Sequence, residues 1–487
     1  EISCSLVGSE MCIRDRLCIM FNLENFSENI AVVEENGREI TYGDLQKACD
    51  LLASQISSRS LIFNLCQNCF GSLVGYVSAL CNRNVPLMLD AQIDKALLFN
   101  FLAVYKPDYL WVPKAMSGYF GGRAVFASWE YVLVKTDNDR IYPLAEDLAL
   151  LLTTSGSTGS PKFVRQSYRN IQANTDSIVK YLNLDDRERA ITSLPMNYTF
   201  GLSVINSHLA VGASLILSDK TLMQREFWQQ LGDYKATSLS GVPYTFEMLD
   251  RLRFYRRDLP NLRTLTQAGG KLLPELHKKF AEYAEQTGKK FVVMYGQTEA
   301  TARMSYLPPE KCLEKVGSMG VAIPGGRFFL INENGEIITE AERIGELVYE
   351  GDNVTLGYAV RGEDLAKGDE RHGRLETGDM AKFDKDGYFY IVGRKKRFLK
   401  IFGNRVNLDE TERLIKGSFN EIDCACAGRD DAMYIFITDE SKTKEVRNFV
   451  AETSHLNFTA FYVKYLASIP RNDVGKAIYA ELEKYYD

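Results

Sequence analysis

In the first half of the chain, apolar positions at helical spacing alternate with short, continuous apolar runs. In TYGDLQKACDLLASQI, apolar residues recur about every 3.6 positions, at Leu45, Ala48, Leu51, Leu52 and Ile56, which predicts an amphipathic helix. SLIFNL then predicts a strand, GSLVGYVSALCNRN a helix and VPLML a second strand. Strands separated by helices predict an α/β fold with mainly parallel sheets that helices cover on both faces.

The stretch 271–298 repeats this pattern with clear boundaries. Pro274 is placed where the first turn of a helix tolerates proline, and Gly288 is placed where that helix ends. FVVMYG follows as a buried strand that ends in a loop. Ligand sites in such sheets gather beyond the carboxyl ends of the strands, so we expect functional residues directly after this strand.

After residue 320 the pattern changes to short strands and turns. GGRFFLINENGEIIT contains the hairpin signal Asn334-Gly335 between apolar runs, and GELVYEG and GYFYIVGR predict further strands of an antiparallel β subdomain. The last 90 or so residues mix helical stretches (LDETERLIKGS, KTKEVRNFVAET) with strands (MYIFIT, FYVKYL), which predicts a small α+β domain.

We therefore expect a large N-terminal domain at 20–395 and a small, mobile C-terminal domain at 396–487. Residues 1–19 are expected to be a non-native leader, because EISCSLVGSEMCIRDR resembles translated adapter sequence and lacks the apolar region of a signal peptide. Met20 is then the expected start of the natural protein, which would carry no targeting segment.

The composition narrows the function. Among 487 residues, 45% are apolar and 25% charged, and the net charge is −6. Such a chain has neither the basic footprint of a nucleic-acid-binding protein nor a membrane-spanning stretch of roughly 20 apolar residues. Cys66 and Cys69 form a C-x-x-C in apolar surroundings, with no second pair and no histidine at zinc-ligand spacing. Buried, reduced cysteines favour a cytoplasmic location.

Residues 152–162, LTTSGSTGSPK, carry the first chemical signal. They follow the apolar run LALLL, and their hydroxyls, backbone N–H groups and lysine suit phosphate oxygens. The loop is not a Walker A motif, because Ser160 and Pro161 separate the second glycine from Lys162. Taken alone, a loop of this composition is more often only flexible.

The complete order TSGSTGSPK resembles the phosphate loop of the adenylate-forming superfamily, and further segments resemble that superfamily in the same order. They are MYGQTE at 294–299, GELVYEG at 345–351 with GY at 357–358, TGD at 377–379, the hinge segment 393–405 and PRNDVGK at 470–476. The superfamily contains acyl- and aryl-CoA synthetases, peptide-synthetase adenylation domains, D-alanine–carrier-protein ligases and luciferase. The resemblance implies ATP-dependent activation of a carboxylic acid as an acyl adenylate, release of pyrophosphate and transfer of the acyl group to a thiol.

The resemblance also implies individual roles. Lys476 would bridge the acyl carboxylate and the α-phosphate, and Glu299, beside Thr298, would organise Mg²⁺. Tyr295 would stack on adenine, Asp379 would accept hydrogen bonds from both ribose hydroxyls, and Arg394 would contact the ribose or a phosphate. The full set of implied nucleotide-binding residues is Thr154, Ser155, Gly156, Ser157, Thr158, Gly159, Lys162, Gly269, Gly270, Lys271, Tyr295, Gly296, Asp379 and Arg394. Phe163 replaces the usual glycine after Lys162, and we expect it to narrow the approach to the loop.

The acyl pocket is expected around Tyr198 and Gly201. Tyr198 replaces the histidine of acyl- and aryl-CoA synthetases, and Gly201 stands where amino-acid activators have an aspartate that holds the substrate's ammonium. An ammonium without a counter-charge is costly to bury, so we predict a fatty, aromatic or hydroxy acid without an α-amino group.

The expected acceptor is CoA, and the alternative is the phosphopantetheine of an acyl carrier protein. Lys396 would be the hinge, and Lys400 and Gly403 would face the thiol after the C-terminal domain rotates. A catalytically inactive nucleotide-binding protein is a further alternative, against which the presence of Lys476, Glu299 and Asp379 argues. Oxidative, luciferase-like chemistry on this fold has no support in the sequence.

Overall fold

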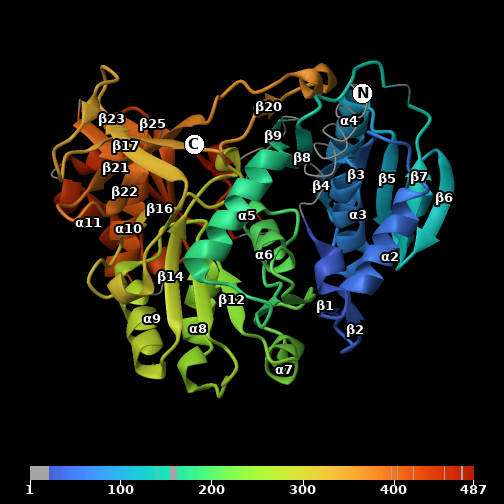
Figure 1. Ribbon diagram of the computed structural model, residues 1–487. Coiled ribbons are helices and arrows are strands. Elements are labelled where there is room, and N and C mark those ends of the chain that lie inside the picture. The colour runs from blue at the N-terminus through green and yellow to red at the C-terminus, as the bar shows by residue number, and fades with distance from the viewer. Residues whose placement is uncertain are drawn as a thin grey trace, which may run out of the picture.

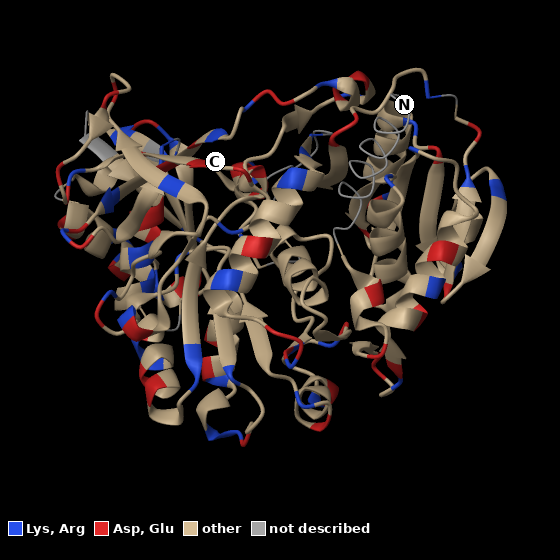
Figure 2. Ribbon diagram, viewed as in Figure 1, with Lys and Arg blue, Asp and Glu red and all other residues tan. Residues whose placement is uncertain are grey.

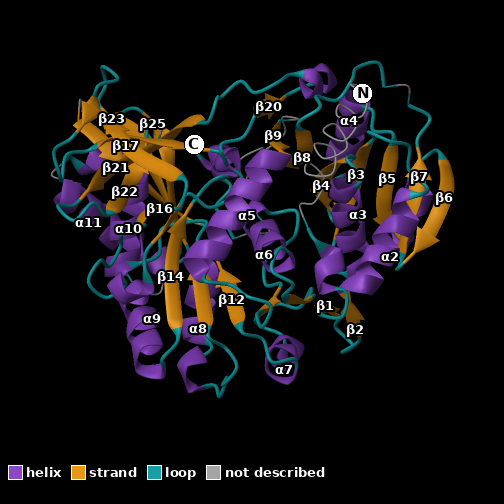
Figure 3. Ribbon diagram, in the orientation of Figure 1, coloured by secondary structure: helices purple, strands orange, loops and turns teal. Residues whose placement is uncertain are grey.

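The computed structural model describes residues 21–138, 140–153, 162–395, 397–402, 404–419, 422–454, 456–472 and 475–486. Two large sheets stand side by side with helices between and around them, and the C-terminal part packs beside the second sheet (Figure 1). Helices and strands alternate along most of the described chain (Figure 3). This arrangement confirms the predicted α/β class.

The first sheet has the strand order β20-β9-β8-β4-β3-β5-β7-β6. The strands β8, β4, β3 and β5 are parallel, and both edges of the sheet are antiparallel. Its strands are β3 (Leu61–Cys66), β4 (Val85–Asp90), β5 (Tyr109–Pro113), β6 (Arg123–Ser128), β7 (Tyr131–Lys135), β8 (Leu148–Thr153), β9 (Phe163–Ser167) and β20 (Gly357–Ala359).

The second sheet has the order β16-β15-β14-β13-β12-β10-β11-β1-β2 and is parallel from β14 to β1. Its strands are β1 (Ile30–Val33), β2 (Glu39–Thr41), β10 (Arg189–Ile191), β11 (Ser214–Ile216), β12 (Ser238–Gly241), β13 (Thr264–Gln267), β14 (Lys290–Tyr295), β15 (Ser305–Tyr306) and β16 (Val321–Ala322). The predicted strand FVVMYG is β14.

The helices around these sheets are α2 (Tyr42–Ala53), α3 (Phe70–Cys81), α4 (Lys95–Tyr105), α5 (Tyr168–Leu182), α6 (Thr199–Leu209), α7 (Arg225–Asp233), α8 (Pro243–Arg251) and α9 (Pro274–Thr287). Every residue of α6 is buried, as is all of α3 except its last residue, and one hydrophobic core joins both helices to both sheets. Helix α9 begins at Pro274 and is capped by Gly288, as predicted. Helix α2 is shorter than predicted, and its Leu51 is 48% exposed rather than part of the apolar stripe.

The predicted antiparallel β subdomain is a sheet in the order β18-β17-β19-β21-β22. Its strands are β17 (Gly326–Ile331), β18 (Ile337–Ile338), β19 (Gly345–Gly351), β21 (Arg374–Phe383) and β22 (Phe389–Arg394). The Asn334-Gly335 hairpin connects β17 to β18. Short 3₁₀ helices complete the chain: η1 (Leu23–Phe26), η2 (Lys114–Tyr119), η3 (Phe254–Arg256), η4 (Thr298–Ala300), η5 (Pro309–Lys311), η6 (Gly362–Ala366), η7 (Glu440–Lys442), η8 (Phe458–Ala460) and η9 (Glu483–Tyr485).

The C-terminal part combines helices with two small sheets around a hydrophobic core of its own. Strands β25 and β26 are antiparallel, and β27 joins β26 in parallel. Its elements are β23 (Phe398–Ile401), β24 (Asn404–Asn407), α10 (Leu408–Ser418), β25 (Cys424–Arg429), β26 (Ala432–Ile437), α11 (Thr443–Ser454), β27 (Phe461–Tyr465) and α12 (Tyr479–Leu482). The domain boundary at 395/396 stays a prediction, and residue 396 lies outside the described residues.

Surface charge and cysteine environment agree with an ordinary globular fold. Lys and Arg alternate with Asp and Glu over the elements visible in Figure 2. The thiol of Cys66 is buried, which raises its pKa, and the described cysteines are free thiols. No helix within the described ranges is long and apolar enough to cross a membrane.

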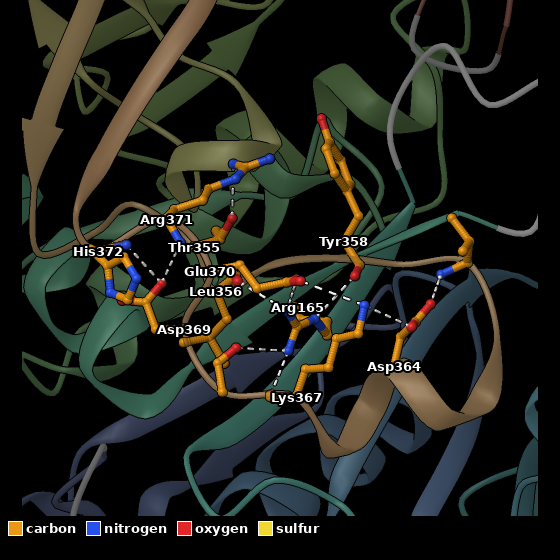
Figure 4. Close-up of polar contacts among 12 residues, drawn as sticks. Arg165, Thr355, Leu356, Tyr358, Asp364, Lys367, Asp369, Glu370, Arg371 and His372 are labelled. Atoms are coloured by element: carbon orange, nitrogen blue, oxygen red, sulfur yellow. Dashed lines mark hydrogen bonds and ion pairs between the residues drawn. The ribbon is translucent and has the colours of Figure 1, made fainter.

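Arg165 holds strand β20 against β9. Its side chain is fully buried and donates from Nε to the Tyr358 carbonyl at 3.2 Å and from Nη2 to the Leu356 carbonyl at 3.0 Å. It also donates to the Gly368 carbonyl. Figure 4 shows its contact with the Glu370 carboxylate. Because β9 directly follows the predicted phosphate loop, Arg165 fixes β20 next to that loop.

We expect Arg165→Met to lower the free energy of unfolding by about 2–4 kcal/mol, because several buried carbonyls lose their donor. Glu370→Gln is the matched variant and should cost less than Arg165→Met, since it keeps every carbonyl contact of Arg165 and the Glu370 side chain is 46% exposed. Urea unfolding followed by tryptophan fluorescence measures both. Equal losses in the two variants would show that the ion pair, rather than the carbonyl contacts, carries the stabilisation.

Candidate active site

The loop after β14 begins the candidate site. Tyr295 is the last residue of the strand, and Gly296 lies so close to Ala302 that an added Cβ would be 1.8 Å from the Ala302 carbonyl oxygen. Only glycine therefore fits after the tyrosine. The single 3₁₀ turn η4 then buries Thr298 and leaves Glu299 partly exposed. The local backbone thus fixes where the Glu299 carboxylate points.

Asp379 connects this loop to the antiparallel sheet. It pairs across the strands with Arg394 in the register of β21 and β22, and the Arg394 Nε lies 3.4 Å from its Oδ1. The Tyr295 hydroxyl donates to Asp379 Oδ2 at 2.5 Å. Burial raises the pKa of the Asp379 carboxyl, while Arg394, Tyr295 and Lys476 act in the opposite direction. Two acceptor oxygens thus face the site with cationic neighbours.

Lys476 reaches this cluster from the C-terminal part. Its backbone N–H donates to Asn472 Oδ1 at 2.9 Å, and an added Cβ on Gly475 would be 3.3 Å from Tyr244 Cβ in α8. The Lys476 ammonium lies 5.9 Å from the centre of the Tyr198 ring. The C-terminal segment therefore delivers a cation among residues of the N-terminal part.

The electrostatic neighbours of Lys476 are other residues of the expected site. Burial, together with the positive charge of Arg394, lowers the pKa of the Lys476 ammonium to about 8. The negative charges of Asp379 and Glu299 oppose this shift. Lys476, Arg394, Asp379 and Glu299 thus interact within one site, although they come from four separate segments.

Tyr358 joins Glu299 to the end of the predicted phosphate loop. Its hydroxyl donates to Glu299 Oε1 at 2.6 Å, and the Lys162 ammonium lies 3.4 Å from the centre of its ring. The Arg371 guanidinium lies 4.7 Å from the same ring and donates to the Glu299 carbonyl at 2.9 Å. Burial and the Glu299 charge raise the pKa of Tyr358 to about 12, so the hydroxyl keeps its proton to donate.

The donor set of this site fits Mg²⁺ that arrives with a nucleotide. Within the described ranges, no three His, Cys, Asp or Glu side chains gather closely enough to hold a metal by themselves. Glu299 is a single carboxylate, and Mg²⁺ commonly takes one or two carboxylates together with substrate phosphates and several waters. Lys162, over the ring of Tyr358, and Lys476, which interacts with Glu299, supply positive charge in the same site.

Tyr198 and Gly201 form the start of helix α6, and Tyr198 lies against the glycine segment 269–270. An added Cβ on Gly269, which has φ +84°, would be 2.7 Å from the Tyr198 hydroxyl. At Gly201 an added Cβ would be 2.3 Å from the Pro195 carbonyl oxygen, so the backbone leaves no room for a side chain there. The two predicted pocket residues are therefore near the predicted nucleotide segment.

Two predicted residues have other neighbours. The Lys271 ammonium donates to the Ile391 carbonyl in β22 at 2.6 Å, and burial lowers its pKa. Lys400 is exposed in β23, where its backbone N–H donates to Asp430 Oδ1 at 2.8 Å. The structure thus does not place either ammonium in the cluster around Lys476.

The predicted phosphate-loop residues and part of the predicted hinge lie outside the described residues. These are Thr154, Ser155, Gly156, Ser157, Thr158 and Gly159 in the loop, and Lys396 and Gly403 in the hinge. The loop's two flanking residues are described and pair across β8 and β9, Thr153 with Phe163.

Phe163 does not narrow the approach to the loop as expected. Its side chain is fully buried, with ring centroids 4.9 Å from Phe101 and 4.8 Å from Tyr105 of helix α4. The alternation of side chains along a strand turns the residue after Lys162 into the core. The expectation was wrong because it considered the loop without the strand that follows it.

Tyr358 and Arg371 are functional candidates that the sequence did not assign. Tyr358 belongs to the recognised GY segment, but its role depends on β20 pairing with β9, nearly 200 residues earlier in the chain. Arg371 lies in the charged stretch GDERHGR, which gives no reason to select one arginine. Pairing between distant strands, rather than any local pattern, brings both residues to Glu299.

A match to a family model shows which protein family the chain belongs to. The model described as AMP-binding enzyme matches residues 21–359. The chain belongs to this family. The match contains Tyr295, Glu299 and Tyr358, whereas Asp379 and Lys476 lie beyond it.

Curated relatives of this AMP-binding enzyme include CoA ligases. Oxalate–CoA ligase of Arabidopsis thaliana is 31% identical over 301 residues, which cover 59% of this chain and 57% of that protein. Peroxisomal OPC-8:0-CoA ligase 1 of the same plant is 28% identical over 354 residues, which cover 70% of this chain and 64% of that protein. The matched region thus spans less than two thirds of the length of these relatives.

Solved structures show the fold over nearly the whole AMP-binding enzyme. The o-succinylbenzoate CoA synthetase of Bacillus subtilis, in complex with its acyl-adenylate intermediate, superimposes with a TM-score of 0.76 at 20% identity, covering 95% of this chain and 97% of that one. ATP-bound MatB from Rhodopseudomonas palustris gives a TM-score of 0.74 at 21% identity, covering 96% and 99%. The shared architecture includes the C-terminal part.

Proposed function

We propose that this AMP-binding enzyme activates a carboxylic acid as an acyl adenylate and transfers the acyl group to CoA. The observation that carries the proposal is the position of Lys476, whose ammonium interacts with Glu299, Asp379 and Arg394. A cation from the C-terminal part in this position suits two anions that must approach each other. The names of the relatives, which include oxalate–CoA ligase and feruloyl-CoA synthase, support the same activity.

The first half-reaction joins two negatively charged groups. A carboxylate oxygen of the acid attacks the α-phosphorus of ATP, the bond from that phosphorus to the oxygen bridging to the β-phosphate breaks, and pyrophosphate leaves with the bonding electrons. Protonated Lys476 would offset the repulsion between the carboxylate and the phosphate. Lys162 would bind phosphate oxygens from the other side, and Asp379 would hold the ribose. Mg²⁺ bound with ATP would neutralise part of the phosphate charge.

In the second half-reaction the thiol sulfur attacks the acyl carbonyl carbon, and AMP leaves with the electrons of the carbon–oxygen bond. CoA is the acceptor that we propose, because several of the curated relatives are CoA ligases. The phosphopantetheine of a carrier protein is the alternative. The hinge at Lys396, the thiol face at Lys400 and Gly403, and a cytoplasmic location stay predictions.

Mass spectrometry of the purified enzyme with ATP, Mg²⁺, CoA and pooled carboxylic acids tests the proposal. The expected products are an acyl-CoA and one equivalent each of AMP and pyrophosphate. Acyl-AMP without acyl-CoA would favour the carrier-protein alternative. Production of ADP, or no product with any acid, would contradict carboxylate activation. In an ATP–pyrophosphate exchange assay, activity with alanine but not with fatty or aryl acids would contradict the expected substrate class.

We expect Tyr358→Phe to raise the Mg²⁺ concentration for half-maximal adenylation about tenfold. The substitution removes the hydroxyl that donates to Glu299 but keeps the ring beneath Lys162. Tyr390→Phe is the matched control, because Tyr390 also donates to a carboxylate, that of Asp384, outside the cluster. A Mg²⁺ dependence unchanged in Tyr358→Phe would mean that Tyr358 does not orient Glu299.

A further inference from the structure

Arg303 is a buried arginine directly beside the loop that begins with Tyr295 and Gly296. The residue as a whole is only 3% exposed. An added Cβ on Gly296 would be 2.8 Å from the Arg303 Cα, and the next residue, Met304, donates its N–H to the Tyr295 carbonyl at 2.8 Å. The backbone of Arg303 is thus part of the candidate active site.

The described neighbours of the Arg303 guanidinium are all uncharged. Nε donates to Ser203 Oγ at 3.0 Å in helix α6, and Nη1 donates to the Tyr181 hydroxyl at 3.2 Å in helix α5. The guanidinium carbon lies 5.1 Å from the centre of the Phe200 ring. Nη1 also lies 3.6 Å from Met294 Sδ, and Nη2 has no hydrogen-bond acceptor among the described residues.

Arg165, the other buried arginine of the described chain, has an acidic partner, Glu370. The half-buried Arg397 pairs with Asp409 and Glu412 at 2.8 Å each. Arg303 has no carboxylate within 4.0 Å in the described part of the chain. The phosphate-loop segment 154–161, TSGSTGSP, contains no acid in its sequence. A buried cation without a counter-charge is costly, so the protein alone leaves this site electrostatically incomplete.

Two neighbouring aromatic rings lie between Lys476 and Arg303. The Lys476 ammonium lies 5.9 Å from the Tyr198 ring, the Tyr198 and Phe200 ring centroids are 6.4 Å apart, and Arg303 follows on Phe200. Both rings stand at the start of helix α6, next to Gly201, where no side chain fits. One cation therefore lies near each end of this pair of rings.

We propose that Arg303 binds a second carboxylate of the acyl substrate, so that the acid activated by this enzyme is a dicarboxylic acid with an apolar or aromatic middle. The inference rests on the proposed function, because it assigns Lys476 to the carboxylate that reacts. A guanidinium forms paired hydrogen bonds to a carboxylate with fixed geometry. Nη2 supplies a donor for such a pair, and the Phe200 and Tyr198 rings contact the carbon skeleton between the two carboxylates.

The experiment compares each dicarboxylic acid with its monomethyl ester, which has nearly the same length but one charge. The series contains α,ω-dicarboxylic acids of two to twelve carbons and the benzenedicarboxylic acids. ATP–pyrophosphate exchange is expected to show kcat/KM at least about tenfold higher for the best diacid than for its ester. Arg303→Gln should remove this preference, and Arg303→Lys should retain part of it, because lysine keeps the charge without the paired donors.

Arg327→Gln is the matched control. Arg327 also lies over a phenylalanine ring, that of Phe329 at 5.4 Å, but its side chain is 71% exposed and stands near the start of β17 in the antiparallel sheet. This variant should keep the wild-type preference. Equal kcat/KM for diacid and ester in the wild-type enzyme, or a preference that survives in Arg303→Gln, would overturn the inference.

Thermal unfolding with ATP and each acid gives a readout besides activity and needs no variant. Diacids should raise the melting temperature of the wild-type enzyme more than their monomethyl esters do. If Arg303→Gln does not fold, this comparison and the wild-type exchange rates still decide the inference. If none of the acids supports ATP–pyrophosphate exchange, the proposed function is contradicted. Greater stabilisation by diacids than by their esters in the same samples would still support Arg303 as a carboxylate-binding residue. Equal stabilisation by diacids and esters would overturn that role.

Discussion

Lys476→Ala is expected to lower the rate of acyl-adenylate formation at least about 100-fold while ATP still binds. The Lys476 ammonium interacts with Asp379 and Glu299, so it lies where the acyl carboxylate and the α-phosphate would meet. Removal of this charge leaves the repulsion between the two anions unopposed in the transition state. The contacts that hold the ribose and the outer phosphates come from other segments, so nucleotide affinity should change little.

Single-turnover formation of acyl-AMP measures the rate, and calorimetric titration measures ATP affinity. Lys464→Ala is the control, because Lys464 belongs to strand β27 of the same C-terminal part and lies 5.5 Å from the Tyr434 ring. Its rate should equal that of the wild-type enzyme. Adenylation at the wild-type rate in Lys476→Ala would refute the role assigned to this lysine.

The pH dependence of adenylation is a second test of the role of Lys476. Burial lowers the pKa of Lys476 to about 8, so the ammonium is charged below this pH and loses its charge as the pH rises through it. We therefore expect kcat/KM for adenylation to fall above about pH 8, since this ratio reports the free enzyme. Bound anions favour the charged form, so the fall in kcat should occur at higher pH. Lys476→Arg should be slower but should lack the fall.

Asp379→Ala is expected to weaken ATP binding about 100-fold, equivalent to roughly 2.7 kcal/mol. Asp379 is 8% exposed, and its carboxylate already accepts from the Tyr295 hydroxyl. Two ribose hydroxyls would each add a hydrogen bond to a charged acceptor, worth about 1.5–3 kcal/mol in isolation. Because the ribose must share Asp379 with Tyr295, we expect the loss of binding free energy to be smaller than the sum of two such hydrogen bonds.

Deoxynucleotides separate ribose binding from a purely structural role. The wild-type enzyme should bind 2′-deoxy-ATP and 3′-deoxy-ATP more weakly than ATP, whereas Asp379→Ala should bind all three with similar affinity. Asp384→Asn is the control for loss of a carboxylate in the same sheet, because Asp384 accepts from Lys315 and Tyr390 away from the cluster. If Asp379→Ala still discriminates against the deoxynucleotides, Asp379 does not hold the ribose.

The sequence predicted the candidate site where a motif is local and complete. Glu299 and Asp379 each belong to a short segment whose spacing determines the turn that presents the side chain. Arg303 was not predicted, although it is a lone charge in the otherwise uncharged stretch ATARMSY. The role proposed for Arg303 depends on its hydrogen-bond partners Ser203 and Tyr181, which are about 100 residues away or more in the chain. No local sequence pattern shows that these partners are uncharged.

The fold was predictable in class but not in topology. Alternating helices and strands predicted the parallel sheets, and the Asn334-Gly335 turn predicted the antiparallel hairpin. The periodicity does not reveal that the strands divide between two large sheets, or that β20 leaves its sequence neighbours β19 and β21 to pair with β9. That pairing depends on the buried contacts of Arg165 with distant carbonyls, which only the folded chain brings together.

The central claim is that this AMP-binding enzyme activates carboxylates, and ATP–pyrophosphate exchange without any thiol tests it most directly. The account predicts exchange that requires both Mg²⁺ and a carboxylic acid, occurs without CoA and is lost in Lys476→Ala. Exchange that proceeds without an acid, or an enzyme that converts ATP only to ADP under these conditions, would contradict the account.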